Sequence, residues 1–373
     1  MRTLVVSDLH LGARRQPDVL RGDGPRAALT QLVRGCGRLV LLGDVVELRH
    51  GPWRQALAAA EPVLRDLGQA LGGDGEVVLV PGNHDHGLLG GWLERRATQG
   101  ESAALGLEAE VPWRPDEPLG EIASWLSPAA VRVAYPGVWL REDVYATHGH
   151  YSDRHITVPI LERLGAGLMT RVIEEPDGGP RRAEDYEATL APMYAWIDAV
   201  AQAGGVRGRG GGGLQVRAWR SLQPTRAMST SLRSRFGRRV RTAGLSVVFP
   251  ALVGALNRTG IGPLHADVSG PALRSAGLSA FAESLERLRA RPAFAIFGHT
   301  HRAGPLPGDE QGEWRTHAGG AILNCGSWVH AGALLGADPR RSPYRPGFAV
   351  LVEDDGAPRL VNLLDGEPAP ARG

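Results

Sequence analysis

Short hydrophobic runs recur along the chain, and each ends in a polar turn that contains glycine or a charged residue. The runs span residues 4–6, 39–42, 77–80, 144–146, 294–297, 321–323, 348–352 and 360–363. They are rich in Val, Leu and Ile, and continuous apolar runs of this length are typical of strands buried on both faces. Helical periodicity separates several of them, for example at residues 26–33 and 55–67. Strands that alternate with helices predict an α/β architecture.

Two stretches interrupt this alternation. Residues 88–140 are rich in Trp, Tyr and Pro, and we expect them to form a cap over a site. The alternating pattern covers residues 1–155 and 291–373, which predicts one catalytic domain interrupted by a mostly helical insertion at residues 156–290. Between Ala199 and Ala266 this insertion carries eleven Arg and no Asp or Glu.

Polar side chains directly follow five of the hydrophobic runs. In chain order they are Asp8 and His10, Asp44, Asn83, His148, and His299 with His301. In an open α/β sheet, ligands bind beyond the carboxyl ends of the strands. We therefore expect these five loops to converge on one rim, although they are spread over most of the chain.

The residue types in these loops point to a metal site. Asp8 and His10 are two positions apart, so in an extended segment both side chains would point the same way. The carboxylate of Asp44 can bridge two ions, and the amide oxygen of Asn83 can bind a hard ion without adding charge. Mixed imidazole and carboxylate ligands suit Mn, Fe, Co, Ni or Zn better than Ca. Each motif alone is an ordinary turn or surface sequence, but their ordered conjunction after strands favours the metal site.

Composition sets only broad limits on function. The net charge is +2 and 43% of the 373 residues are hydrophobic, which is typical of a globular protein. Cys36 and Cys325 lie in no CxxC pair, which predicts two buried free thiols rather than a disulfide. The sequence shows no signal peptide and no apolar run of about 20 residues, so we expect a cytoplasmic protein.

The ordered motifs DxH, GDxxE, GNHD, H and GHTH resemble those of the calcineurin-like metallophosphoesterase superfamily. The resemblance implies an α/β fold of two mixed β-sheets in a sandwich flanked by helices, with two divalent transition metal ions at the sheet edge. Manganese is the first expectation, with Fe, Co, Ni or Zn as alternatives. Carried over motif by motif, one ion is bound by Asp8, His10, Asp44 and His301. The other ion is bound by Asp44, Asn83, His148 and His299.

The same resemblance implies the catalytic groups. His84 becomes the catalytic histidine, Asp85 the carboxylate that orients it, and Glu47 a residue behind the ligands. The implied reaction is hydrolysis of a phosphate ester or diphosphate by in-line attack of a metal-bridging hydroxide. His84 then steadies the developing charge or protonates the leaving group.

Within the superfamily, the opening SDLHLG and the NHD followed by GLLG resemble the UDP-diacylglucosamine pyrophosphatase branch. That branch hydrolyses a nucleotide–lipid diphosphate. It commonly has Arg where this sequence has His84, and Asp where this sequence has His150. A phosphomonoester, a cyclic nucleotide, a nucleotide–lipid diphosphate and a DNA end therefore all stay open as substrates. A non-catalytic scaffold on the same fold is disfavoured because every ligand position is filled.

Further polar residues lie close to the motifs. We expect His150, Asp153 and His155 to line the substrate site, although a helix start with ordinary polar residues explains them equally well. His50 and His86 are expected at the rim rather than as ligands.

The Arg-rich part of the insertion has several possible roles. An Arg cluster beside a short apolar segment can dock on the anionic inner face of a membrane or bind the phosphates of a large substrate. A flexible linker followed by a buried helix is the simpler interpretation. Few aromatic residues interleave the Arg residues, so a nucleic acid partner is not expected.

Overall fold

The computed structural model describes residues 1–14, 16–98, 104–157, 178–203, 270–332, 334–336 and 338–365. The strands are β1 (Thr3–Val6), β2 (Arg38–Leu42), β3 (Glu76–Val80), β4 (Glu108–Glu110), β5 (Ala130–Arg141), β6 (Val144–Thr147), β7 (Phe294–Phe297), β8 (Ala321–Asn324), β9 (Phe348–Val352) and β10 (Arg359–Asn362). The α-helices are α1 (Asp23–Val33), α2 (Trp53–Leu71), α3 (Gly90–Thr98), α4 (Pro118–Trp125), α6 (Ala183–Ala203) and α9 (Gly270–Arg287). Short 3₁₀ helices are η1 (Val19–Arg21), η2 (Leu48–His50), η3 (His86–Leu89), η4 (His150–Arg154) and η5 (Gln311–Glu313).

The described strands form one mixed sheet of ten strands. Its order is β10-β9-β1-β2-β3-β5-β6-β7-β8, with β4 paired to β5. β1, β2, β3 and the first part of β5 are parallel, and so are β6, β7 and β8. The α/β architecture is confirmed, because helices connect the parallel strands as the alternating pattern predicts.

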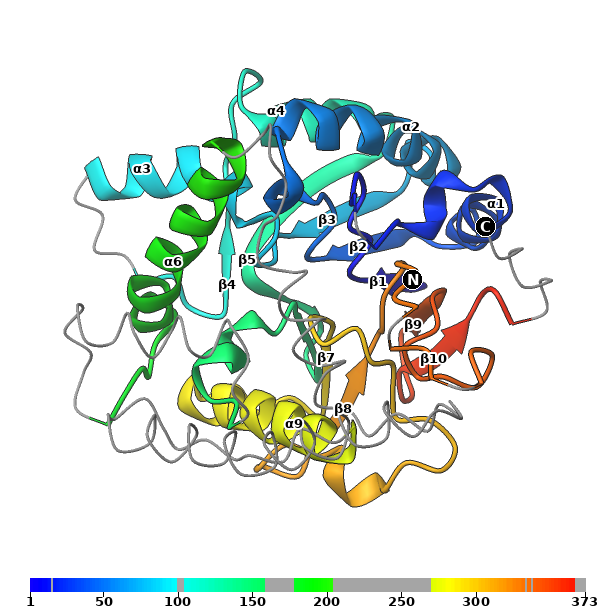
Figure 1. The fold of residues 1–373 in the computed structure, drawn as a ribbon, viewed down its shortest axis with the longest axis vertical. Coiled ribbons are helices and arrows are strands. Elements are labelled where there is room, and N and C mark those ends of the chain that lie inside the picture. The colour runs from blue at the N-terminus through cyan, green and yellow to red at the C-terminus, as the bar shows by residue number, and fades with distance from the viewer. Residues whose placement is uncertain are drawn as a thin grey trace, which may run out of the picture.

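Strand β5 joins the two halves of this sheet. Its first residues pair in parallel with β3, whereas the part from Gly137 to Arg141 pairs antiparallel with β6. Pro136 and Gly137 mark the change, since Pro donates no backbone hydrogen bond and Gly adapts to sharp bends. The expectation of two separate sheets is therefore not confirmed: the two halves face each other but belong to one hydrogen-bonded path (Figure 1).

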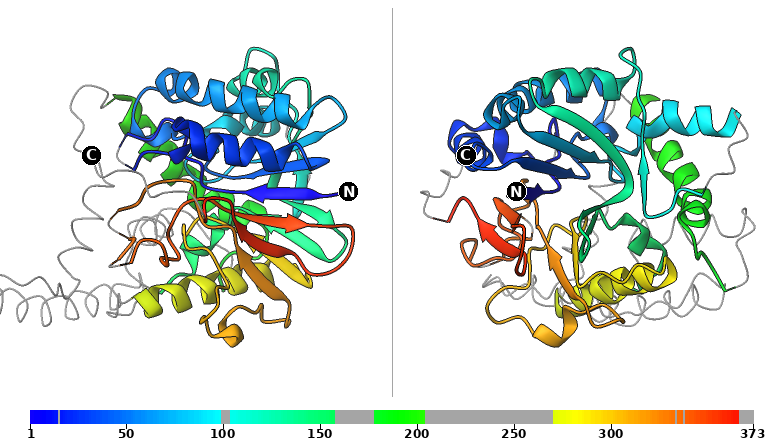
Figure 2. Two further views of the ribbon diagram at one scale, coloured as in Figure 1. Left: turned by 90° about the vertical axis from the view of Figure 1, so that its right-hand side faces the viewer. Right: turned by 180° about the vertical axis from the view of Figure 1, so that it is seen from behind.

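Apolar side chains fill the space between the two halves and the outer faces as well. Val5, Val40 and Val78 from the first half meet Ile296 and Leu323 from the second in one buried cluster. The outer face of the first half packs against α1, α2 and α4, and the outer face of the second half packs against α9 (Figure 2). The core is thus layered as helices, half-sheet, half-sheet and helix.

Helix α2 shows how the sequence pattern builds these layers. Its buried residues recur at intervals of three or four, which places them on one helical face toward the sheet. Gly68 lies on this face, where an added Cβ would come within 2.2 Å of the carbonyl oxygen of Leu126. A residue without a side chain therefore lets α4 approach α2 closely.

One expectation about the irregular stretches needs correction, and another concerns residues that the structure does not describe. Residues 88–140 do not form a cap, because they supply α3, β4, α4 and the central strand β5. The described ends of the expected insertion form α6 and α9. The Arg-rich residues 204–269 lie outside the described residues. The expectation that they dock on a membrane concerns this segment and therefore stays a prediction. Among the described helices, none combines the length and hydrophobicity that a membrane span requires.

Candidate metal centre

The predicted ligands gather at the carboxyl ends of β1, β2, β3, β6 and β7. Three groups of side chains bring potential ligand atoms within 4.8 Å of one another. The groups are Asp8 with His10 and His301, His10 with Asp44 and His84, and Asp44 with His148 and His299. Shared members link the three groups, so the loops form a single site as the strand order requires.

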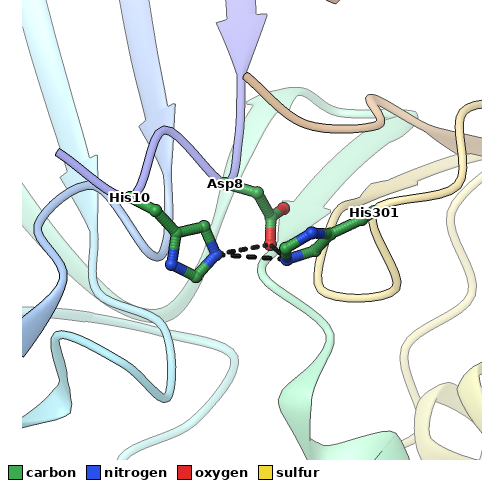
Figure 3. A group of neighbouring side chains, drawn as sticks. All are labelled: Asp8, His10 and His301. Atoms are coloured by element: carbon green, nitrogen blue, oxygen red, sulfur yellow. Dashed lines mark hydrogen bonds and ion pairs between the residues drawn. The ribbon is translucent and has the colours of Figure 1, made fainter. Parts of the chain in front are cut away.

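The first cluster joins the opposite ends of the chain (Figure 3). His301 Nε2 lies 3.2 Å from Asp8 Oδ1 and 3.1 Å from His10 Nε2. His10 Nε2 also lies 3.7 Å from Asp8 Oδ1 and 3.6 Å from Asp44 Oδ2. All three side chains therefore direct a nitrogen or oxygen atom toward one point.

The second cluster surrounds Asn83. The Asn83 side-chain oxygen lies 3.1 Å from His148 Nε2 and 3.1 Å from His299 Nδ1. His148 Nε2 is in turn 3.3 Å from Asp44 Oδ2. Asp44 thus contacts both clusters through the same carboxylate oxygen.

Backbone strain coincides with the ligands. Six non-glycine residues in the described part of the chain have positive φ angles, and five of them are predicted ligands: Asp8, His10, Asp44, His299 and His301, with φ between 45° and 62°. The left-handed region costs a side-chain-bearing residue roughly 1–2 kcal/mol. Such strain clusters at functional sites. The expected extended conformation of the Asp8–His10 segment is wrong, because left-handed turns rather than strand alternation make the side chains converge.

Glycines provide room for the ligand side chains. A Cβ added to Gly298 would lie 1.9 Å from Ser7 Oγ and 2.4 Å from Asp8 Oδ2. At Gly82 it would lie 2.4 Å from Asp44 Oδ1, and at Gly43 it would lie 2.3 Å from the His148 ring. A residue with a side chain at any of these three positions would therefore collide with a ligand or with its neighbour.

Hydrogen bonds behind the ligands fix the orientation of the rings. His10 donates from Nδ1 to Glu47 Oε2 at 3.0 Å, and His148 donates from Nδ1 to the Leu42 carbonyl at 3.0 Å. Carboxylate and carbonyl oxygens only accept, so each ring must donate through this nitrogen. The opposite nitrogen, Nε2, then presents its lone pair to the site. His299 is reversed, because its Nε2 donates to Asp153 Oδ1 at 2.7 Å and leaves Nδ1 to face Asn83.

These residues fit divalent metal ions. With the tautomers just described, the lone pair of His148 Nε2 faces the oxygens of Asn83 and Asp44, and acceptors so placed repel each other unless a proton or a metal ion lies between them. Asp8 Oδ1 is buried and accepts no hydrogen bond from the described residues. Imidazole, carboxylate and amide donors together match the preferences of first-row transition metals.

The pKa shifts of His148 and Asp44 also indicate that the site favours bound positive charge. Burial by itself lowers the pKa of His148, but the nearby Asp44 carboxylate outweighs it and raises the pKa to about 9. Burial also opposes the charged form of Asp44, yet His148 and His84 hold its pKa well below the usual range. Without metal, the site thus draws protons onto His10, His148 and His299, whose pKa values are raised, although burial lowers the pKa of His301. Bound cations would replace those protons.

His84 and Asp85 lie at the site but have different partners from those expected. The His84 ring donates from Nδ1 to Glu47 Oε2 at 2.9 Å, and its backbone N–H donates to Asp44 Oδ1 at 2.7 Å. Asp85 instead accepts from the backbone N–H groups of Gly82 at 2.6 Å and Val45 at 2.7 Å. Glu47 therefore orients the histidine, and Asp85 ties together the turns that carry Asp44 and Asn83.

The residues expected to line the substrate site lie behind the metal ligands. His150 is buried and contacts the Tyr135 hydroxyl at 3.1 Å. Asp153 is buried against His299, and His155 contacts the Tyr186 hydroxyl at 2.5 Å. His150 and Asp153 are thus enclosed by protein groups, whereas His155 is partly exposed. Their assignment to substrate therefore stays a prediction.

Sequence reasoning missed one charged residue near the site. Glu187 of α6 is buried and lies 2.9 Å from His86 Nε2, so His86 is buried rather than at the rim. Nothing marks Glu187 in the sequence, because it stands in an ordinary amphipathic helix far from every motif. Its place becomes visible only when α6 folds back onto the loops.

An α/β sheet that gathers imidazole, carboxylate and amide groups at the carboxyl ends of its strands forms a candidate metal site. A family model described as calcineurin-like phosphoesterase matches residues 1–201. The chain belongs to this family and is a metal-dependent phosphoric ester hydrolase. No curated protein matches the sequence. Among solved structures, a dimetal phosphatase from Danio rerio is similar over 97% of this chain and 99% of its own, at 13% identity and a TM-score of 0.35.

Proposed function

We propose that the protein hydrolyses a phosphate ester or diphosphate of a small molecule at a pair of divalent metal ions. The position of Asp44 carries this proposal. Its Oδ2 lies 3.6 Å from His10 Nε2 and 3.3 Å from His148 Nε2, so one carboxylate oxygen serves two neighbouring ligand clusters. A single ion would leave one of these clusters without a cation.

The proposed ligand sets follow the two clusters. One ion is held by Asp8, His10, Asp44 and His301, and the other by Asp44, Asn83, His148 and His299. When bound, such a pair clamps a phosphate and supplies a hydroxide nucleophile at neutral pH. We propose manganese as the first ion to test, because it suits the Asp and Asn oxygens, with iron and zinc next, because they suit the imidazole ligands.

His84 is positioned to act on the phosphate. Its Nδ1 is held by Glu47, which leaves Nε2 as the ring nitrogen that does not contact Glu47. The side chain is 24% exposed, so a bound substrate can reach it. In its doubly protonated form, His84 would donate from Nε2 to the leaving oxygen, a contribution typically of about 10²–10⁴-fold.

Two carboxylates support the ligands rather than the reaction. Glu47 fixes the tautomers of both His10 and His84. Asp153 fixes the tautomer of His299 through a bond of 2.7 Å. Partners of this kind increase the basicity of the ligand and hold its ring in place.

Alanine substitutions at the shared ligand Asp44 and at His148, a ligand of the second ion, test the proposal. Asp44→Ala and His148→Ala should both abolish Mn²⁺-dependent hydrolysis of an aryl phosphate ester, because the ions and the nucleophile are lost together. Elemental analysis should find about two metal ions per wild-type chain and fewer in either variant. Unchanged turnover in both variants would contradict the assignment, and a folded wild-type protein that takes up no metal would do the same.

The substrate class needs a separate experiment. The opening motif supports a nucleotide–lipid diphosphate, whereas His84 and His150 depart from that branch. Initial rates on phosphomonoesters, phosphodiesters and nucleotide diphosphates, each with Mn²⁺, Co²⁺ or Zn²⁺, rank these classes directly. Co-sedimentation with anionic vesicles tests whether the Arg-rich segment brings the enzyme to a lipid surface.

A further inference from the structure

Helix α6 inserts a buried carboxylate beside the metal centre. Glu187 is 8% exposed, and its two oxygens are surrounded by hydrogen-bond donors from other parts of the chain. Burial alone would raise the pKa of Glu187, but His86 and two tyrosine hydroxyls reverse the effect and hold the pKa below its usual range. A buried charge is costly unless it is fully hydrogen-bonded, so these contacts are specific rather than incidental.

Three donors converge on this carboxylate. Tyr135 and Tyr151 donate their hydroxyl hydrogens to Glu187 Oε1 at 2.5 and 2.7 Å. His86 Nε2 donates to Oε2 at 2.9 Å. The donors come from three different elements, namely β5, η4 and η3, so Glu187 connects all of them to α6.

Two of these elements continue directly from ligand-bearing turns. His86 begins η3, three residues after Asn83, and Tyr151 lies in η4, three residues after His148. Tyr135 also contacts His150, and the ring centroids of His150 and His148 are 5.7 Å apart. The single carboxylate therefore fixes the spacing between the segments that carry two ligands of the second cluster.

The other end of α6 holds a third ligand loop. Gln202 donates from Nε2 to the carbonyl oxygens of Leu48 and Gly51 at 3.2 and 2.9 Å. Asp198 accepts from Trp53 Nε1 at 2.9 Å. These contacts lie just after Asp44 and Glu47 in the chain. One helix thus contacts the segments that follow Asp44, Asn83 and His148.

We propose that Glu187 is a positioning residue for the metal centre, through which α6 holds the Asn83 and His148 loops at the separation that metal binding requires. The inference rests on the proposed function, because the loops it joins carry the proposed ligands. It also makes α6 a part of the catalytic unit rather than of an outlying insertion.

The experiment compares Glu187→Gln with the wild-type protein. The amide keeps the size of the side chain but loses the charge and one acceptor oxygen, so it cannot accept from all three donors. We expect Mn²⁺ affinity, measured by calorimetry without substrate, to fall about tenfold, as for other groups behind metal ligands. In the metal-free protein, we expect faster amide hydrogen exchange in residues 86–92 and 149–155. With saturating Mn²⁺, kcat should fall more than KM changes.

A second variant and a matched control keep the result interpretable. Tyr151→Phe removes one donor and leaves the carboxylate, so it should weaken Mn²⁺ binding in the same direction by a smaller factor, even where Glu187→Gln folds poorly. Glu76→Gln makes the same chemical change at the amino end of β3, on the side of the sheet opposite the ligands, where Arg38 and Arg132 donate to Glu76. It should leave Mn²⁺ affinity and the exchange of both segments unchanged.

The possible outcomes separate the two proposals. A wild-type protein that binds no metal would overturn the proposed function, and the exchange experiment would still test the positioning role. A wild-type protein that binds metal, beside a Glu187→Gln variant with equal affinity and equal exchange, would overturn the positioning role alone. A loss of affinity in Glu76→Gln equal to that in Glu187→Gln would assign the effect to general stability and likewise overturn it.

Discussion

The two ends of the parallel strands hold charged side chains in opposite ways. At the amino ends, Glu76 lies 2.6 Å from Arg38 and 3.2 Å from Arg132, and all three side chains are partly exposed. At the carboxyl ends, Asp8 and Asp44 are buried, and their nearest ionisable neighbours are imidazole rings. Opposite charges balance each other at the first end. At the second end, the buried carboxylates depend on protons or cations for compensation.

The backbone differs in the same way. Arg38 and Glu76, the first residues of β2 and β3, have ordinary extended conformations. The turns that follow the strands instead place Asp8, Asp44 and His299 in the left-handed region. The first end is therefore a self-sufficient ion-pair network that adds a little stability. At the carboxyl ends, the ligand residues adopt strained backbone conformations that direct their side-chain atoms toward one place, as a binding site requires.

The largest expected effect comes from filling the space at a ligand turn. Gly298→Ala should reduce kcat/KM by about 10²-fold or more, because the new methyl group would overlap Ser7 and the Asp8 carboxylate and displace ligands by a large fraction of an ångström. Steady-state rates with Mn²⁺ measure this. Gly312→Ala is the control, since a Cβ at Gly312 meets nothing within 4 Å. Equal rates for both variants would show that the carboxyl-end turns tolerate displacement.

A smaller effect is expected behind the ligands. Glu47→Gln should weaken Mn²⁺ binding or turnover by about 10–100-fold, because the amide no longer accepts equally from the rings of His10 and His84. Metal titration and initial rates on the same preparation separate binding from catalysis. If Asp85→Asn lowered turnover while Glu47→Gln left it unchanged, then Asp85 rather than Glu47 would be the partner of His84.

The metal-free protein should lose stability as the pH rises. His148 has a pKa of about 9 in the folded protein, above the value of about 6.5 for an unfolded chain. A raised folded pKa contributes stability that is complete below about pH 6.5 and is lost as the pH rises through about 9. The pKa of His10 is raised in the same direction. Burial lowers the pKa values of His150 and His301, so their opposite contribution is confined to the part of the window near pH 6.5, and both rings are neutral in both states at higher pH.

Thermal unfolding with EDTA between pH 6.5 and 9 measures this effect. The melting temperature of the metal-free protein should fall across the range, whereas that of the Mn²⁺-loaded protein should fall less, because cations then replace the protons. A metal-free protein whose melting temperature rises over this range would show that the carboxyl-end rings are not protonated.

The smallest effect is expected at the amino ends. Glu76→Gln should lower the free energy of unfolding by about 1 kcal/mol or less, because its ion pairs are partly exposed to solvent. Urea denaturation of the Mn²⁺-loaded protein gives the value. A cost of several kcal/mol would mean that both ends of the strands depend on charge to the same degree, and the contrast between them would be lost.

Much of this arrangement was predictable from local sequence. The strands β1, β2, β3, β6 and β7 stand out as apolar runs, and their ligands follow directly. Strand β5 is the exception, because Pro136 and Gly137 interrupt its pattern and read as a turn. β4 has only three residues, two of them Glu, and carries no strand pattern at all.

The parts of the site that local sequence did not reveal depend on contacts between distant segments. The left-handed turns at Asp8 and His10 were unexpected, since Asp and His give no signal for positive φ comparable to that of Gly. Glu47, rather than Asp85, orients His84, and this depends on how the turn after β2 packs against the turn after β3. Glu187 meets His86 only after α6 folds back across 101 positions of the chain.

The change of pairing along β5 separates the proposed ligands into two sets, one on each half of the sheet. Asp8, His10 and Asn83 stand on one side of this change, whereas His148 and His299 stand on the other. Each proposed cation would consequently have ligands from both halves of the sheet and would hold them together. Pro136 and Gly137 lie where the pairing of β5 changes from one half to the other, so we expect a backbone change there to alter the spacing between the two sets of ligands.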